Sequence, residues 1–168
     1  IYKSKLQNVY LKKENDNPLT YTGWIIIPSE INAPDKFSSN VEKLQSLSHP
    51  KWCTKSQNAR PYLSQGDFHI YMENGKPKLG VRYTREKIHE IQGEYNDNKI
   101  PLKYLYVALE HTQNQKMNEN LKMEFKQAEK IIRRFEEKAG GSLKNASTED
   151  LLKAVDIRAI RDEEDGLL

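Results

Sequence analysis

The stretch DFHIYMENGKPKLGVR, residues 67–82, decides the fold of this chain. Asn74-Gly75 is the strongest two-residue signal for a β-hairpin, because both turn positions require a positive φ angle. Apolar residues alternate with polar ones on both sides of the turn, as in a half-buried strand. The turn predicts two antiparallel strands in one register: Glu73 with Lys76, Met72 with Pro77, Tyr71 with Lys78, Ile70 with Leu79, His69 with Gly80, Phe68 with Val81, and Asp67 with Arg82.

This register predicts which side of the hairpin is buried. The buried face would contain the apolar residues Phe68, Ile70, Met72, Leu79 and Val81. The outward face would contain Asp67, His69, Tyr71, Glu73, Lys76, Lys78 and Arg82. There we expect the cross-strand ion pairs Asp67–Arg82 and Glu73–Lys76, each worth about 0.2–1 kcal/mol. Gly80 opposite His69 would leave room for a ligand or another backbone, or would ease the twist of the strand.

Segments on both sides of the hairpin predict an α+β domain. Residues 21–27 are an apolar run typical of a buried strand. Residues 37–47 predict a helix capped by Asp35, with apolar positions spaced by 4, 3 and 3 on one face. Residues 87–92 predict a third strand, and two isoleucines three residues apart indicate that it is bulged or short. We therefore predict a small antiparallel β-meander packed with helices over residues 1–105.

Residues 106–168 predict a helical C-terminal extension. A helix over 102–112 leads into it, and a second one carries an apolar repeat of 4, 3, 4, 3, 4 from Leu121 to Ala139. This repeat is too short to require a coiled coil, and we favour packing on its own domain. Gly140-Gly141 ends the helix. A last helix begins at Ser147 or Thr148, with an apolar face supplied by Leu151, Leu152 and Val155.

Composition excludes several classes of protein. The 168 residues include one cysteine, which excludes an internal disulfide framework and a multi-cysteine metal site and predicts a reducing, cytoplasmic compartment. No apolar run is long enough to span a membrane. The net charge of +3 is too small to indicate nucleic acid or a membrane surface. Because the sequence begins at Ile1 rather than Met, we expect a piece of a longer polypeptide.

Cys53 is the candidate nucleophile. A cysteine nucleophile needs an imidazole to hold its proton, and the candidates are His49 and His69. Asp67 or Glu90 would orient that histidine. In the competing interpretation, the cysteine is a small buried hydrophobic residue beside a tryptophan. No local signature of a known cysteine hydrolase surrounds it.

The outward face of the hairpin and the following turn form the candidate binding surface. Basic residues interleaved with an aromatic one can follow a phosphate backbone and stack bases; the candidates are Tyr71, Lys76, Lys78, Arg82, Arg85 and Lys87. The alternative is a solvated sheet face whose charges protect the edge. We expect no metal and no other cofactor, because paired ligand spacings and phosphate-binding glycine loops are absent from the sequence.

Several motifs before residue 105 form a block that resembles a known domain. They include Gly23-Trp24, Trp52-Cys53-Thr54-Lys55-Ser56, Gly66-Asp67-Phe68-His69 and Asn74–Arg82. The block is similar to a domain of large proteins from bacterial mobile elements and phages, and its Trp-Cys and Gly-Asp-Phe elements are distantly similar to PcfJ-like proteins. The resemblance covers about residues 20–105. It implies a bacterial or phage source and a modular context, and it transfers no catalytic residue.

The sequence thus favours a non-enzymatic binding module of a larger intracellular protein. Its partner would be nucleic acid or another protein, with no membrane. The alternative is a cysteine-dependent enzyme that uses Cys53 with His49 or His69.

Overall fold

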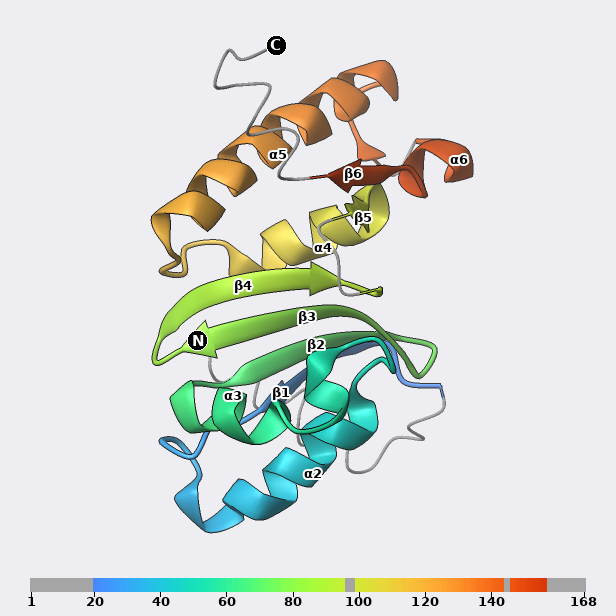
Figure 1. The fold of residues 1–168 in the computed structure, drawn as a ribbon. Helices are drawn as coiled ribbons and strands as arrows, with labels where there is room; N and C mark the ends of the chain where they lie inside the picture. The colour runs from blue at the N-terminus through green and yellow to red at the C-terminus, as the bar shows by residue number, and fades with distance from the viewer. Residues whose placement is uncertain (1–19, 96–98, 144–145, 157–168) are drawn as a thin grey trace. The chain divides into compact units, whose positions relative to one another are not determined.

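The chain divides into two units in the computed structural model, which describes residues 20–95, 99–143 and 146–156 (Figure 1). Unit 1 spans Ile1–Asn96 and unit 2 spans Asp97–Leu168. The boundary precedes the expected one at residue 105, because the strand that begins at Lys99 pairs with a strand near the end of unit 2. The architecture is α+β, as predicted.

Unit 1 is built on a four-stranded antiparallel sheet of order β1-β2-β3-β4. The strands are β1 (Gly23–Ile27), β2 (Phe68–Glu73), β3 (Lys76–Thr84) and β4 (Lys87–Gly93). Asn74 and Gly75 have φ angles of 51° and 76°, so the turn between β2 and β3 has the predicted positive-φ geometry. The predicted hairpin and its two neighbouring strands are confirmed.

Helical segments cover one face of this sheet (Figure 1). They are the 3-10 turns η1 (Pro34–Lys36) and η2 (Cys53–Lys55) and the helices α2 (Phe37–Leu47) and α3 (Ala59–Gln65). The core between helices and sheet consists of apolar side chains, including Ile25, Val41, Leu44, Trp52, Leu63, Phe68 and Ile70. Each of these is at most 5% exposed, so the hydrophobic effect holds the layers together.

The predicted helix over 37–47 is confirmed, but its predicted cap is wrong. Asp35 lies within η1, and the residue that precedes the first turn of α2 is Lys36. The N-terminus of α2 has no side-chain cap, because η1 runs directly into it.

The predicted register of the hairpin is correct only next to its turn. Glu73 pairs with Lys76 and Met72 with Pro77, but Tyr71 then pairs with Leu79, so that Lys78 is an extra residue in β3. This is a β-bulge, and proline favours one because it cannot donate to the strand ladder. All pairs beyond the bulge are shifted by one residue, including Ile70↔Gly80, His69↔Val81 and Phe68↔Arg82.

Because of this shift, the residues that were predicted to share one buried face lie on both sides of the sheet. Phe68 and Ile70 share the helix-covered side with Arg82 and Gly80, whereas Leu79 and Val81 share the other side with Tyr71 and His69. His69, predicted to point outward, is 4% exposed. The pairing of β3 with β4 shifts at Arg82/Tyr83, which confirms the expected irregularity of the third strand.

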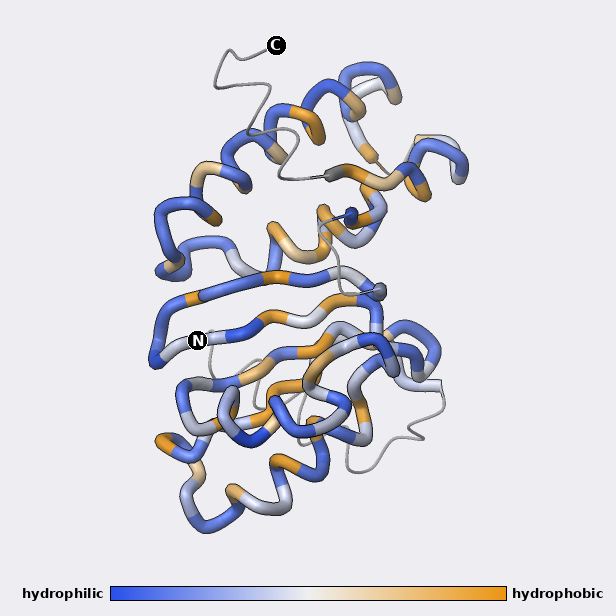
Figure 2. Tube along the Cα trace, in the orientation of Figure 1, coloured by the Kyte–Doolittle hydropathy of each residue, from blue (hydrophilic) through white to orange (hydrophobic). Residues whose placement is uncertain are grey.

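Unit 2 consists of a helical pair and a short two-stranded sheet. Its elements are β5 (Lys99–Pro101), α4 (Leu102–Thr112), α5 (Glu119–Lys138), α6 (Thr148–Leu151) and β6 (Ala154–Asp156). Figure 2 shows hydrophobic and hydrophilic residues alternating along α5. Its buried residues are Leu121, Phe125, Ala128 and Ile132, and α5 packs on α4. The helix therefore packs on its own unit, as expected.

The ends of the helices follow the predicted signals, with one correction. Gly140 and Gly141 have φ angles of 87° and 103° and end α5. Ser147 caps α6, its side chain accepting from the Asp150 N–H at 3.1 Å. Val155 was predicted on the face of this helix, but α6 stops at Leu151 and Val155 pairs with Ile100 in the β5–β6 sheet. A three-residue strand is too short to give a period-2 pattern.

Candidate functional site

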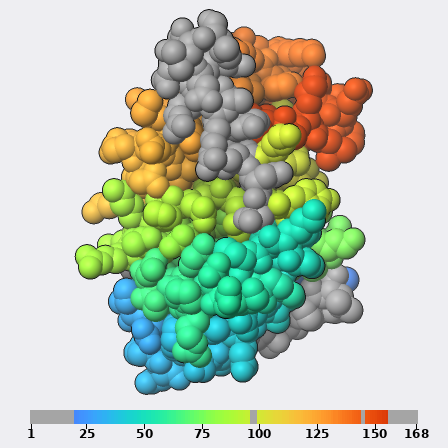
Figure 3. Space-filling view, viewed as in Figure 1, coloured from blue at the N-terminus to red at the C-terminus, as the bar shows by residue number. Residues whose placement is uncertain are grey.

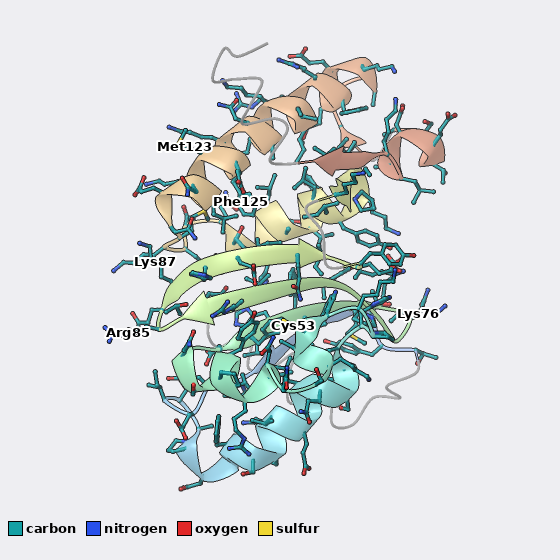
Figure 4. The ribbon with its side chains drawn as sticks, viewed as in Figure 1. Cys53, Lys76, Arg85, Lys87, Met123 and Phe125 are labelled. Atoms are coloured by element: carbon teal, nitrogen blue, oxygen red, sulfur yellow. The ribbon has the colours of Figure 1, made fainter. Side chains whose placement is uncertain are left out.

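The Cys53 thiol belongs to a polar cluster formed by η2, α3, β3 and β4 (Figure 4). Its sulfur donates to the Tyr62 hydroxyl at 3.3 Å, and the thiol is half-buried. The guanidinium of Arg82 stacks on the Tyr62 ring, with its carbon 3.7 Å from the ring centroid. We refer to Cys53, Tyr62, Gln65, Arg82 and Glu90 as the Cys53 cluster.

Tyr62 holds its proton firmly in this cluster. The hydrogen bond with Cys53 and then burial raise the pKa of Tyr62 to about 12; burial does so because it disfavours the charged phenolate. A phenol with such a pKa is a poor acceptor for a thiol proton near neutral pH. The partner of Cys53 therefore does not activate it as an imidazole would.

Arg82 is bound within unit 1. Its Nη2 donates to Gln65 Oε1 at 2.9 Å, and its Nη1 lies 3.9 Å from Glu90 Oε1. Only 16% of its side chain is exposed. The predicted Asp67–Arg82 pair is wrong, because the bulge places Arg82 opposite Phe68 on the helix-covered side. The guanidinium is thereby withdrawn from the outward surface.

The two histidines proposed as bases lie away from the Cys53 cluster. His69 is on the opposite side of the sheet, with its ring 4.4 Å from that of Tyr83, and burial lowers its pKa to about 3. His49 accepts from the Lys51 N–H at 3.0 Å and contacts the edge of the Tyr95 ring at 5.5 Å. The described contacts of Cys53 include no histidine.

Asp67, proposed to orient a histidine, instead stabilises a turn. One of its oxygens accepts from the backbone N–H of Ser29 at 2.7 Å and from the amide of Asn32 at 2.9 Å. It therefore links the chain after β1 to the start of β2. In the described ranges, no group of three His, Cys, Asp or Glu residues is arranged to hold a metal ion.

The predicted cationic surface is divided into separate parts. Lys78 pairs with Glu94 at 2.6 Å. Figure 4 shows Lys76 at one end of the sheet and Arg85 and Lys87 at the other. Tyr71 contacts the Trp24 ring, with centroids 5.3 Å apart. With Arg82 also held inside, the six predicted binding residues do not form one surface.

The space predicted beside His69 is filled. Gly80 pairs with Ile70, and a Cβ added there would lie 3.0 Å from both Gln92 Nε2 and the Phe68 ring. The missing side chain thus allows Gln92 and Phe68 to pack over β3. In the space-filling view, the teal residues around α3 form a continuous surface on the visible face of unit 1 (Figure 3).

Unit 2 carries an open groove that is formed entirely by described residues. It has a volume of about 660 Å³ and lies between α4 and α5. Its apolar lining residues are Tyr106, Leu109, Met117, Phe125 and Ile132, of which Phe125 and Ile132 are only 4% and 6% exposed. Figure 4 shows Phe125 pointing towards α4 and Met123 pointing away from it. We call this site the α4–α5 groove.

Charged side chains line the rim of the α4–α5 groove. Lys122 and Lys126 from α5 are exposed, and Glu110 from α4 also lines the groove. Sequence reasoning found the helix pair but missed the groove, because the apolar repeat of α5 indicates only that one face is covered. The sequence offered no separate signal, because Tyr106 follows the apolar spacing of α4, and the structure shows that it is 43% exposed.

No helix among the described residues is both long and apolar enough to cross a membrane. Comparisons with protein-family models, curated proteins and solved structures find no match to this chain.

Proposed function

We propose that this chain is a non-enzymatic binding module and that the α4–α5 groove receives a helical segment of a protein partner. The observation that carries the proposal is that one groove between two helices is lined by both apolar and charged side chains. Its volume of about 660 Å³ matches several side chains, since about 150 Å³ holds one benzene ring. Amphipathic helices bind such grooves through anchors at i, i+4 and i+7.

The contacts in unit 1 support a binding module over an enzyme. The thiol of Cys53 faces a phenol, and the carboxylate of Asp67 is occupied by backbone and amide donors. A protein partner is favoured over nucleic acid because Arg82 and Lys78 already have carboxylate neighbours. We also propose a cytoplasmic location within a larger bacterial or phage protein, on the free thiol and the resemblance of residues 20–105.

The groove can be tested with a peptide probe and the three methionine methyl groups. The probe is a helical peptide of about 18 residues with a leucine stripe and glutamine elsewhere. Met117 lines the groove, Met123 is on α5 but points away from α4, and Met72 is in the core of unit 1. We expect the peptide to shift the Met117 methyl resonance in NMR spectra and to leave the other two unchanged.

A matched pair of variants completes the test. Tyr106→Ala removes part of the groove wall and should weaken binding of the peptide several-fold, whereas Tyr95→Ala removes an exposed tyrosine of unit 1 and should not. Equal shifts at all three methionines, or none, would overturn the proposed site. A shift of labelled single-stranded DNA or RNA that disappears in Lys76→Glu would restore the nucleic-acid interpretation.

A further inference from the structure

The wall of the groove contributed by α5 carries two cations without ion pairs. Lys122 and Lys126 are one helical turn apart, both are exposed, and neither has an ion pair within the described residues. By contrast, Arg133 farther along the same wall lies 3.9 Å from Glu129. Like charges at i and i+4 repel each other, so this end of the wall is destabilised in the free protein.

The start of α5 adds to this positive charge. The helix begins after Asn118, and Lys122 is still in its first turn and a half, where the helix dipole is positive. Glu119 is the acidic residue of the first turn, and it has no described ion pair with either lysine. An anion from outside the helix can therefore add to the partial balance that Glu119 provides.

The opposite wall carries one charge of the other sign, whereas farther along α5 Glu129 and Glu136 also line the groove. Glu110 lies near the C-terminal end of α4, where the helix dipole is negative. A helix lying in the groove has one flank towards Lys122 and Lys126 and the other towards Glu110. The two flanks of a bound helix would therefore meet charges of different sign.

We infer that the occupant of the α4–α5 groove is an amphipathic helix of a partner protein that carries two carboxylates, one turn apart, on the flank facing Lys122 and Lys126. The inference rests on the proposed function, because it needs the groove to bind a helix. The carboxylates relieve the repulsion between the lysines and fix the orientation of the helix. Electrostatic complementarity of this kind gives specificity and a salt-dependent association rate.

Three peptides with the same leucine stripe test the inference. One has glutamine on the lysine-facing flank, one has glutamate and one has lysine, and binding is followed at the Met117 methyl group in low salt. We expect the glutamate peptide to bind about tenfold more tightly than the lysine peptide, with the glutamine peptide between them. The difference should shrink in 1 M salt, where charges are screened within about 3 Å.

Charge reversal on α5 provides the decisive control. In Lys122→Glu/Lys126→Glu the order of the glutamate and lysine peptides should reverse. Arg134→Glu/Lys138→Glu makes the same change in net charge on exposed positions of α5 outside the groove and should keep the original order. An order that follows net charge in both variants would overturn the inference.

The outcomes separate the two proposals. If the glutamine peptide fails to shift Met117, the proposed function fails. If the glutamine peptide binds and all three peptides bind equally, the groove still binds a helix, but the inference of an acidic flank is overturned. A second copy of the chain is the competing occupant: a concentration-dependent dimer in sedimentation, lost in Lys122→Glu/Lys126→Glu, would replace the acidic helix.

Discussion

The Cys53 cluster of unit 1 and the α4–α5 groove of unit 2 differ in whether their polar side chains have partners within the chain. In unit 1, the Cys53 thiol, the Arg82 guanidinium and the Asp67 carboxylate all have partners within the unit. In unit 2, the lysines at the rim of the α4–α5 groove have no ion pair within the described residues. The polar side chains of the Cys53 cluster are therefore held by contacts within unit 1, whereas the two lysines of the groove are not held by an ion pair.

The largest effect should come from Gly66, which tests how tightly unit 1 is built. A Cβ on Gly66 would overlap the Tyr83 carbonyl and lie 2.6 Å from its carbon. Gly66→Ala should therefore reduce the free energy of unfolding by about 3 kcal/mol, measured in urea. Gly141→Ala in unit 2 is the control: nothing lies within 4 Å of its Cβ, and the positive φ alone should cost about 1 kcal/mol. Equal losses would contradict the contrast between the units.

Acid should destabilise unit 1 through His69. Its pKa in the folded chain is about 3, below the ordinary 6.5, because burial disfavours the charged form. The unfolded chain thus binds a proton that the folded chain excludes, and stability falls as the pH decreases from 6.5 towards 3. We expect a loss of about 2 kcal/mol between pH 7 and pH 5, which urea unfolding can measure. His69→Leu should abolish this loss; an unchanged pH profile in the variant would refute the assignment.

A pair of cation substitutions compares the two units directly. Arg82→Ala removes a stacked, hydrogen-bonded side chain and should destabilise the chain by about 1–2 kcal/mol. Lys126→Ala removes an exposed side chain and should change stability by less than about 0.5 kcal/mol. Thermal unfolding monitored by circular dichroism measures both. A larger effect for Lys126 would reverse the comparison.

The smallest effect concerns the rate of thiol labelling. Cys53 is half-buried and hydrogen-bonded to Tyr62, so an aromatic disulfide reagent should label it more slowly in the native chain than in urea. Tyr62→Phe keeps the ring under Arg82, removes the hydroxyl and should raise the native labelling rate several-fold. If Cys53 reacts as fast in the native chain as in urea, the result would favour the interpretation of the protein as a cysteine-dependent enzyme.

Local signals predicted most elements of the fold. Turn chemistry at Asn74-Gly75 and the apolar repeat of α5 each produced the predicted element, because short-range sterics and periodicity determine them. The register failed at Lys78, since a bulge depends on how Pro77 fits against Met72 of β2. The strand that contains Val155 was missed because its partner, Ile100, is distant in the sequence.

The candidate site was less predictable than the fold. A single extra residue in β3 transferred Arg82 from the outward face to the Cys53 cluster and placed Leu79 and Val81 on the side of His69, which is buried there. Each residue type was a reasonable candidate, but its surroundings depend on packing between segments far apart in the sequence. The shape of the groove depends on how α4 and α5 pack against each other, and the apolar periodicity of one helix does not predict that packing.

Because β5 pairs with β6, the two ends of the described part of unit 2 lie next to each other. Lys99 faces Asp156 across the ladder, so the first and last described residues of this unit are strand neighbours, about 5 Å apart. A unit with adjacent ends can be inserted into a surface loop of another protein without stretching either host or insert. The described part of unit 2 thus has the geometry of a domain that could be inserted, with its groove, into a loop of another protein.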